Sequence, residues 1–345
     1  MKKNICFFIL SVFLAVVLIP NFAGSSSPPP PPPPCQTVYP IVLAHGIAMN
    51  DIDVNGTKVI DYFNNIKDAL VANGATVFVA QVDKMAATGT KAYQFAKWLD
   101  TNVWSKGYQK VNIIGHSHGG IYTKYAMKFS SYTNSKYGTF TWSLPASKVA
   151  SLTQIDSPNQ GSPVADFLLA VDDGSGGLVA GALNYLYAPV MNLIFGNKEG
   201  DVYVDVARNG YDLTIDGAAA LYQSLGGNNG IPGVYCQSYM HKQNELLGVA
   251  IPQLGTFQLM SFTMPIQYLA NLIGYKGGPH QPSDGIVSEK SAQWANYRGM
   301  DDGGFWQAAG IDHCNATGLP FGWTGFFDAP AKYVEIVKDL KARGY

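Results

Sequence analysis

The chain has 345 residues, of which 47% are hydrophobic and 14% are charged, and its formal net charge is −1. This length suits one large α/β domain or two small ones, and the hydrophobic content provides for a sizeable core. The near-neutral charge gives no basic surface for nucleic acid, and the low charged fraction is typical of a secreted protein or one that meets an apolar interface.

The amino-terminal segment has the features of an export signal followed by a spacer. Lys2-Lys3 precedes a nearly unbroken apolar stretch, 6–20, and small residues for cleavage follow at 23 and 24. This stretch is short for a membrane span, which needs about twenty residues; an uncleaved anchor is the alternative. We expect a signal peptide over 1–23, a Ser/Pro-rich linker over 24–35, and secretion, with periplasmic or cell-surface retention as the alternatives. The linker is either an extended spacer or a disordered leader.

Short apolar runs alternate with segments of helical periodicity through the first half of the chain. Strands are predicted where apolar and β-branched residues cluster, and helices where apolar residues recur three and four positions apart. The predicted strands are 39–44, 76–82, 111–114, 148–155 and 234–240, and the predicted helices are 59–71, 92–99, 120–127 and 329–340. The β-α-β-α-β order predicts a mostly parallel sheet with helices on both faces, in one α/β domain over 36–345.

The regular alternation ends after Ile155. A glycine-rich stretch, 172–177, leads into 178–195, which is too apolar for an ordinary surface helix and contains Pro189. Two interpretations are open. The segment is either a buried helix pair or a lid that exposes its apolar face only at a lipid surface.

The segment Gly115-His116-Ser117-His118-Gly119 directly follows the predicted strand 111–114 and precedes a predicted helix. It fits G-x-S-x-G, in which a tight strand-to-helix turn holds the serine Oγ above the sheet and small residues leave room for the turn. A bare motif of this kind also occurs by chance. Its position between a strand and a helix favours a nucleophile at Ser117, with an idle serine in a glycine-rich turn as the alternative.

A serine nucleophile needs a base to take its proton and a carboxylate to orient that base, and with this motif the order along the chain is serine, acid, histidine. His313 comes late and on a predicted loop, unlike the other five histidines, and is the candidate base. Asp284 is the candidate acid, with a turn-forming Asp-Gly pair as the alternative. Weaker candidates for the acid are Asp156, Asp302 and Asp312.

Backbone N–H groups must meet the oxyanion of the transition state. One donor is normally the residue after the nucleophile, which is His118 here. The other comes from the loop after the first predicted strand. In Ala44-His45-Gly46-Ile47, the N–H of Ile47 is the candidate donor and Gly46 allows a close approach. A turn that only ends the strand is the alternative.

Three cysteines remain after removal of the predicted signal peptide: Cys35, Cys236 and Cys314. An exported protein meets conditions that permit disulfides. We favour a bond between Cys236 and Cys314, with Cys35 unpaired, although the sequence alone does not establish this pairing.

Together these motifs resemble the true lipases of Gram-negative bacteria, the Pseudomonas and Burkholderia lipase family. The segments that carry the resemblance are 39–46, 111–120 and 157–168, with weaker similarity at 212–221, 283–287 and 312–313. The resemblance covers roughly 38–317 and implies an α/β-hydrolase fold with a helical lid at roughly 172–200. The site residues that it implies are a triad of Ser117, Asp284 and His313 and oxyanion donors at Ile47 and His118.

The resemblance also implies a structural calcium and, for many relatives, a dedicated foldase as a partner. One calcium ligand of the family is an aspartate two residues after the catalytic histidine, where this chain has Asn315. The segment 256–278 has no acidic residue for the other ligand. Because one amide is a weak site for a hard dication, we expect no calcium. A Cys236–Cys314 bond is a hypothesis for what holds the histidine loop instead.

These residues predict a secreted serine carboxylic-ester hydrolase, a triacylglycerol lipase that needs no organic cofactor and meets its lipid ester at a lipid–water interface. Alternatives that use the same residues are a phospholipase, a short-chain carboxylesterase or an acyltransferase. The alternative of another class is a non-catalytic lipid- or surface-binding protein. A metallohydrolase is disfavoured because no histidine pair has the H-E-x-x-H spacing.

Overall fold

A computed structural model describes residues 32–47, 52–54, 57–172, 201–319 and 322–345. The predicted signal peptide, most of the predicted linker and all but the first residue of the predicted lid lie outside these ranges. Residues from Pro33 to Tyr345 form one compact unit. Among the helices that are described, none has the length and apolar character needed to cross a membrane.

A six-stranded parallel sheet forms the centre of this unit, with the strand order β12-β9-β8-β5-β1-β4. The strands are β1 (Ile41–Ala44), β4 (Val77–Ala80), β5 (Val111–His116), β8 (Val149–Ile155), β9 (Tyr235–His241) and β12 (Asn296–Asp301). Because every neighbouring pair is parallel, all six carboxyl ends meet at one edge. That edge is where ligands bind in sheets of this kind.

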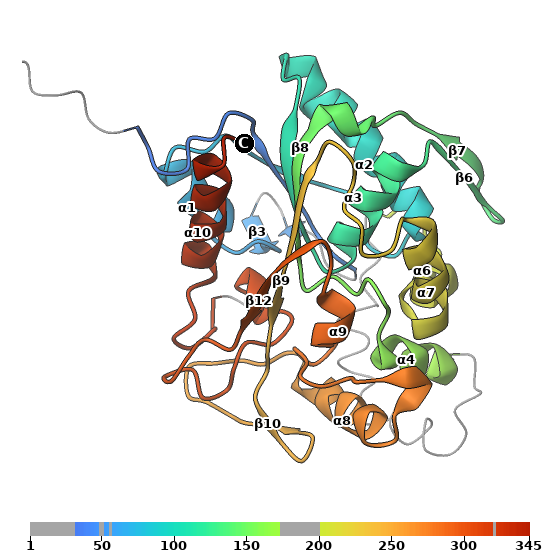
Figure 1. Ribbon diagram of the computed structural model, residues 1–345, viewed down its shortest axis with the longest axis vertical. Coiled ribbons are helices and arrows are strands. Elements are labelled where there is room, and N and C mark those ends of the chain that lie inside the picture. Colours follow the sequence, from blue (N-terminus) through green and yellow to red (C-terminus); the bar gives the residue numbers. More distant parts are fainter. Residues whose placement is uncertain (1–31, 48–51, 55–56, 173–200, 320–321) are drawn as a thin grey trace, which may run out of the picture. The chain divides into compact units, whose positions relative to one another are not determined.

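Helices cover both faces of the sheet, as the alternation predicts (Figure 1). Helices α1 and α10 pack on one face, and α2 and α3 pack on the other. Their bounds are α1 (Ile66–Ala72), α10 (Ala329–Ala342), α2 (Thr88–Asn102) and α3 (His118–Lys128). Successive side chains of a strand point to opposite faces, so Leu43 lies in the core with α1 and α10 whereas Val42 lies in the core with α2 and α3.

The remaining elements surround the carboxyl edge or form hairpins beside the sheet. The helices are α4 (Pro163–Asp172), α6 (Val206–Leu213), α7 (Ile215–Ser224), α8 (Met264–Leu272) and α9 (Glu289–Ala292). The antiparallel hairpins are β2 (Ile52–Val54) with β3 (Thr57–Ile60), β6 (Ser131–Asn134) with β7 (Gly138–Thr141), and β10 (Glu245–Leu246) with β11 (Val249–Ala250). Short 3₁₀ turns lie at Trp104–Lys106, Ala146–Lys148, Ser261–Thr263, Tyr275–Gly277 and Asn315–Thr317.

The predicted helix 59–71 is partly wrong. Residues 57–60 form strand β3, and the helix begins only at Ile66, after Asn65 adopts a left-handed φ of 57°. Two β-branched residues at 59 and 60 contributed to the helical pattern, although such residues favour strands. Strand β12 was not predicted, because an edge strand with no fully buried residue has no apolar alternation to detect.

The predicted Cys236–Cys314 disulfide is wrong. The three cysteines at 35, 236 and 314 are free and buried. Cys236 lies in the core with α2 and α3, whereas Cys314 lies in the core with α1 and α10. The two residues therefore lie on opposite faces of the sheet, whereas a disulfide requires Cβ atoms within about 4.5 Å of each other.

We expect dithiothreitol to leave the melting temperature unchanged, and thiol reagents to react only after unfolding. Burial raises the pKa of all three thiols, to about 11 for Cys236, and it is the thiolate that reacts. Titration with Ellman's reagent, with and without guanidinium, checks this together with thermal melts. Rapid reaction of the native protein, or a lower melting temperature after reduction, would contradict it.

Candidate active site

Ser117 lies in a strained turn between β5 and α3. Its φ of 57° and ψ of −130° fall in a region that residues other than glycine rarely occupy. The turn is fixed on both sides, because the Ser117 N–H donates to the Ile155 carbonyl at 2.8 Å and the Ser117 carbonyl accepts from Gly120 N–H at 3.2 Å. Strain of this kind persists where the surrounding structure imposes it, which is characteristic of functional sites.

The glycines of the motif are required by close packing. A Cβ added at Gly119 would overlap the carbonyl oxygen of Ala44, and one at Gly115 would lie 2.6 Å from Gly120 N. On the facing loop, a Cβ at Gly46 would lie only 2.8 Å from the Cβ of Ser117. The two loops thus approach each other closely around the serine. The sequence predicts such a close approach at Gly46.

His313 and Asp284 form a hydrogen-bonded pair on two loops beyond β9 and β12. His313 Nδ1 lies 2.7 Å from Asp284 Oδ2, and the backbone N–H of His313 donates to the Asp284 carbonyl at 2.9 Å. The other oxygen, Asp284 Oδ1, accepts the N–H groups of Ile286 and Val287 at 2.9 and 2.7 Å. The fully buried carboxylate therefore fixes the imidazole with its proton on Nδ1, which leaves Nε2 as the basic nitrogen.

Burial and the neighbouring charge have opposite effects on the pKa values of His313 and Asp284. Burial alone would lower the pKa of His313, but the Asp284 carboxylate raises it, and the net change is a rise above its usual value. Burial raises the pKa of Asp284, and the His313 ring offsets part of that rise. An imidazolium at position 313 is therefore stabilised by its neighbour, as a general base requires when it accepts a proton.

Ser117, His313 and Ile47 line one cavity, which holds about 840 Å³ of space that is partly open to solvent. Asp284 lies behind His313, and His118 is the first residue of α3. The cavity is otherwise mostly apolar. Its aliphatic and aromatic lining includes Val164, Leu168, Leu213, Met260, Phe262, Ile286 and Leu319. Three of the five residues predicted for the site line this cavity, and Asp284 and His118 lie directly beside them.

The ring of His45 fixes the direction of the peptide between Gly46 and Ile47. His45 Nε2 accepts the N–H of Val82 at 3.2 Å, so the ring proton is on Nδ1, which lies 3.0 Å from the Gly46 carbonyl oxygen. The C=O and N–H of a trans peptide point in opposite directions. The Ile47 N–H therefore points away from His45, as expected for an oxyanion donor on the loop that lines the cavity.

The side chain of Lys91 contacts both segments that carry the predicted oxyanion donors. Its buried Nζ donates to the Lys84 carbonyl at 2.8 Å, contacts His118 Nδ1 at 3.2 Å and lies 3.5 Å from the Gly46 carbonyl. The other nitrogen of His118 contacts Thr88 Oγ1 at 2.8 Å. Burial lowers the pKa of Lys91 to about 7. Lys91 could not be predicted from the sequence, because a lysine on a helix ordinarily lies at the surface.

We expect Lys91→Met to reduce kcat by about 10- to 100-fold with a smaller change in KM, because loss of one oxyanion donor costs roughly 10²- to 10³-fold and this variant only misplaces donors. Lys124→Met is the matched control. Lys124 is also buried, its pKa is also lowered to about 7, and it contacts Gly227 and Trp294 outside the cavity lining. Equal losses in both variants would assign the effect to general destabilisation.

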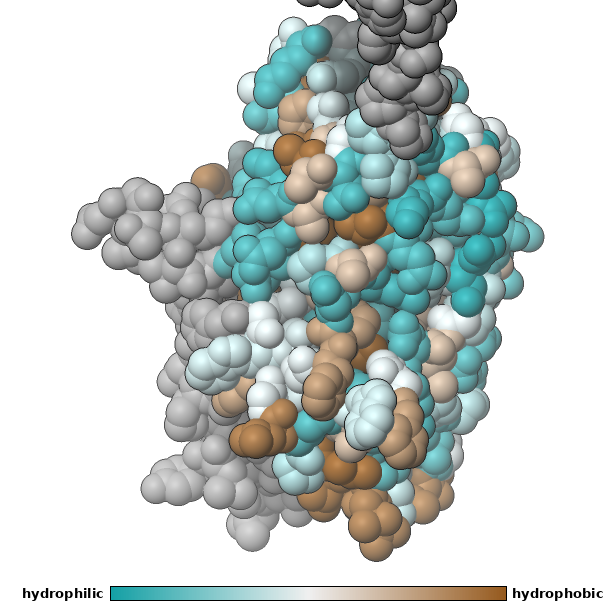
Figure 2. Space-filling view, turned by 90° about the vertical axis from the view of Figure 1, so that its left-hand side faces the viewer, coloured by the Kyte–Doolittle hydropathy of each residue, from teal (hydrophilic) through white to brown (hydrophobic). Residues whose placement is uncertain are grey.

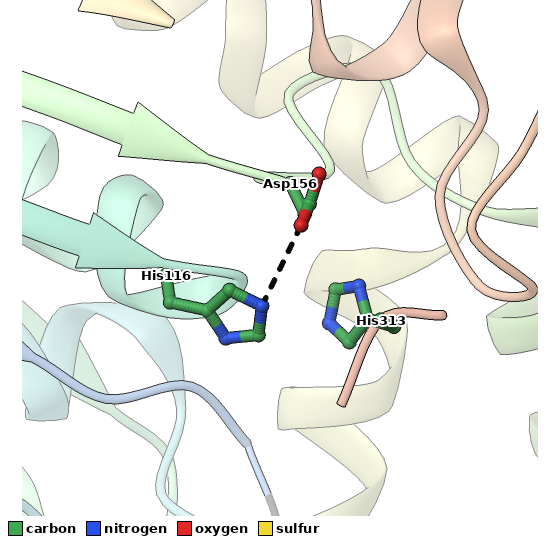
Figure 3. A group of neighbouring side chains, drawn as sticks. All are labelled: His116, Asp156 and His313. Atoms are coloured by element: carbon green, nitrogen blue, oxygen red, sulfur yellow. Dashed lines mark ion pairs between the residues drawn. The ribbon is translucent and has the colours of Figure 1, made fainter. Parts of the chain in front are cut away.

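A second polar cluster lies beside His313 at the same edge of the sheet (Figure 3). Asp156, directly after β8, accepts the His241 backbone N–H at 2.7 Å and lies 2.8 Å from His241 Nδ1. Its Oδ2 is 3.8 Å from His116 Nε2. The ring centroids of His116 and His313 are 4.7 Å apart. Tyr62 completes the cluster, with its hydroxyl 2.7 Å from His116 Nδ1.

The weaker candidates for the acid have other partners. Asp156 pairs with His241, and Asp302 is exposed and accepts the N–H of Gly304. Asp312 accepts the N–H groups of Met260 and Asn315 at 2.8 and 2.7 Å. Burial raises the pKa of Asp312 to about 7. Asp284 is therefore the carboxylate that bonds to the ring of His313.

The side chain of Asn315 connects the His313 loop to a neighbouring segment. Its amide nitrogen donates to the carbonyls of Phe257 and Leu319 at 3.0 and 2.8 Å. Its amide oxygen, Oδ1, is buried without a hydrogen-bond partner among the residues that the structure describes. The bonds of Asn315, together with those of Asp312, connect the His313 loop to the segment 257–260, in place of the disulfide proposed from the sequence.

The chain is similar to known lipases in sequence and in structure. A triacylglycerol lipase of Vibrio cholerae serotype O1 is 32% identical over 258 residues, which are 73% of this chain and 73% of that protein. EstA from Clostridium botulinum superposes with a TM-score of 0.54 at 19% identity, covering 89% of this chain and 88% of that one. Lipase 1 from Pelosinus fermentans gives 0.54 at 16%, covering 88% and 99%. No family model matches the chain. The structural likenesses confirm the predicted α/β-hydrolase fold.

Proposed function

Because this chain belongs to the family of Gram-negative bacterial triacylglycerol lipases, we propose that it hydrolyses triacylglycerol through Ser117, His313 and Asp284. The chain is a hydrolase of the lipase type. Its catalytic residues and its substrate are what we propose. One observation carries it: the His313–Asp284 hydrogen bond of 2.7 Å lies beside a strained serine turn, and both loops open into one apolar cavity.

The proposed reaction uses each residue at a defined atom. His313 Nε2 takes the proton of Ser117 Oγ as the oxygen attacks the ester carbonyl, and the N–H groups of Ile47 and His118 receive the oxyanion. The imidazolium, stabilised by Asp284, then protonates the leaving diacylglycerol. Water repeats the sequence on the acyl-serine and releases a fatty acid. Every step is carried by this chain's own side chains and backbone.

An apolar rim supports the proposal that the substrate is met at a lipid surface. We define this rim as Leu246, Leu247 and Val249 of the β10–β11 hairpin with Leu269, Leu272 and Ile273 at the end of α8. These six side chains are between 57% and 74% exposed. Figure 2 shows apolar residues gathered on the lower part of one face. Lys276 is the only Asp, Glu, Lys or Arg residue in the sequence segment 246–283. Exposed apolar patches of this kind mark interaction sites.

Hydrolysis of p-nitrophenyl esters from C4 to C16, below and above their solubility limits, tests the proposal. We expect the rate to rise when an aggregated substrate forms, and free fatty acid to be released from a triolein emulsion. Activity confined to dissolved short esters would instead identify a carboxylesterase, and release from phospholipid alone would identify a phospholipase. Because many relatives need a foldase, the chain should be produced both alone and with a foldase of such a relative.

We expect the double variant Leu246→Ser, Leu247→Ser to weaken adsorption to a triolein emulsion by about tenfold or more. Each exposed leucine contributes roughly 1–2 kcal/mol when it enters an apolar phase. Hydrolysis of dissolved p-nitrophenyl butyrate should stay unchanged, since neither residue lines the cavity. Val71→Ser on α1, where the side chain is 49% exposed outside the rim, is the matched control. Equal adsorption by all three proteins would exclude the rim as the docking surface.

Export is the last part of the proposed function, and the sequence of residues 1–24 supports it. We propose that a signal peptide is removed near residue 23 and that the mature lipase acts outside the cytoplasm. Amino-terminal sequencing of protein recovered from medium, periplasm and cell surface tests both points. Recovery of an intact amino terminus in the cytoplasm alone would contradict them.

A further inference from the structure

Three buried side chains converge from different elements beside the proposed base. His116 ends β5, Asp156 follows β8, and His313 lies on the loop after β12. One potential ligand atom from each lies within 4.8 Å of the other two, and all three residues are buried (Figure 3). The ring of His116 is buried and interacts with the backbone of His313, and its Nε2 lies 3.8 Å from Asp156 Oδ2. The close approach of two imidazoles and one carboxylate in a buried place is therefore the observation to explain.

Each of the three side chains is already oriented by an outer partner. Asp284 holds Nδ1 of His313 and the Tyr62 hydroxyl contacts Nδ1 of His116, so Nε2 of each ring can bind an ion when the ring proton is on Nδ1. The backbone N–H and the ring of His241 hold the carboxylate of Asp156. Histidine ligands of metal ions have this outer support, with the second ring nitrogen bonded to a carboxylate or another polar group.

We propose that His116, Asp156 and His313 form a binding site for Zn²⁺ and that the bound ion inhibits ester hydrolysis. Two imidazole nitrogens and one carboxylate oxygen match the ligands of a three-coordinate protein site for zinc, with an open fourth position. Donor atoms around a tetrahedral zinc ion lie roughly 3.4 Å apart, given bonds of about 2.1 Å. The 3.8 Å between His116 Nε2 and Asp156 Oδ2 must therefore close by about 0.4 Å, and the widest separation among the three ligand atoms, which is at most 4.8 Å, by as much as about 1.4 Å.

Two of the three proposed ligands lie at the surface of the cavity. His116 and His313 both line it next to Ser117, so an ion can enter and leave by the route that the substrate uses. An ion on Nε2 of His313 occupies the lone pair that would accept the serine proton. Inhibition follows from the proposed role of His313, whereas binding rests on the geometry of the three ligands alone. Ca²⁺ and Mg²⁺ prefer oxygen ligands and should not compete.

Binding is measured first, without reference to catalysis. Calorimetric titration with ZnCl₂ and the visible absorption of the Co²⁺ complex are recorded for wild type, Asp156→Asn and Asp312→Asn. Asparagine tolerates the left-handed φ of 51° at position 156. Asp312 is a matched control, because it is equally buried and adjoins His313 but is not among the three ligands. His116→Gln is the second test variant, and thermal melts establish that each variant is folded.

We expect wild type and Asp312→Asn to bind one Zn²⁺ with a Kd in the micromolar range or below, with a tetrahedral Co²⁺ spectrum. Asp156→Asn and His116→Gln should bind at least tenfold more weakly. Absence of binding to wild type, or equal binding by folded Asp156→Asn and His116→Gln, would overturn the site.

Inhibition is then measured on p-nitrophenyl butyrate as the residual rate of each protein relative to its own rate in EDTA. Zinc should inhibit wild type reversibly at the concentrations at which it binds, and the inhibition curves of Asp156→Asn and His116→Gln should shift to at least tenfold higher zinc. Binding to wild type without inhibition at saturating zinc would uphold the site and overturn the proposed role of His313 as the base.

Discussion

Ser117→Ala is expected to lower kcat/KM for ester hydrolysis by about 10⁴-fold or more, the scale at which removal of a nucleophile acts in triads of this kind. The methyl group fits the strained turn without new contacts, so the fold and the cavity should remain. Activity on p-nitrophenyl butyrate and covalent labelling by a fluorophosphonate both report on the nucleophile. Wild type should take up one label per chain and the variant none.

Ser162→Ala is the matched control for this experiment. Ser162 is also buried and lines the same cavity, but its hydroxyl donates to the Ile286 carbonyl and its backbone lies outside the strained turn. We expect this variant to keep at least a tenth of the wild-type rate and to be labelled fully. A Ser117→Ala protein that retains a hundredth of wild-type activity, or that is still labelled, would show that another residue is the nucleophile.

Asp284→Asn should have the second largest effect, a loss of roughly 10³- to 10⁴-fold in kcat/KM. The amide would present its NH₂ to Nδ1 of His313, which moves the ring proton to Nε2 and leaves no lone pair for the serine proton. Asp312→Asn is the matched control because Asp312 bonds to backbone N–H groups and not to the ring. A loss below tenfold for Asp284→Asn, or an equal loss for Asp312→Asn, would contradict the assignment.

The pH profile of the residual activity gives a second readout for this variant, in buffers that contain EDTA. Asp284 raises the pKa of His313 by stabilising the imidazolium. Removal of that charge makes the protonated ring less stable, so the pKa falls. The acid limb of the kcat/KM profile, along which the base becomes protonated, should therefore move to lower pH. A limb that stays in place would mean that Asp284 does not interact with the ring that titrates.

The local parts of this site could be predicted from sequence. The turn at Ser117 depends on a strand, two glycines and a helix that are neighbours along the chain, so the motif specifies the geometry. The pairing of His313 with Asp284 follows from the order of residues in this type of hydrolase, although 29 positions separate them. Asp284 is preferred to its three rivals because it follows a Gly/Pro-rich loop, precedes an apolar run and stands before His313 in the expected order.

The cluster of His116, Asp156 and His241 could not be predicted. Each residue ends a strand or directly follows one, and the strands are neighbours only because the sheet has the order β9-β8-β5. Nothing in the sequence of one strand specifies its neighbours. Tyr62 and Lys91 were missed for a related reason, since their roles arise from contacts across the core that local periodicity does not record.

The amide of Asn315 has a further consequence for how the enzyme responds to its surroundings. A crosslink made by a dissolved ion strengthens or weakens with the concentration of that ion, following mass action. The crosslink from Asn315 to Phe257 and Leu319 is part of the polypeptide, so its local concentration is constant. These two hydrogen bonds should therefore hold the loop that presents His313 with a strength that does not depend on the concentration of a dissolved ion.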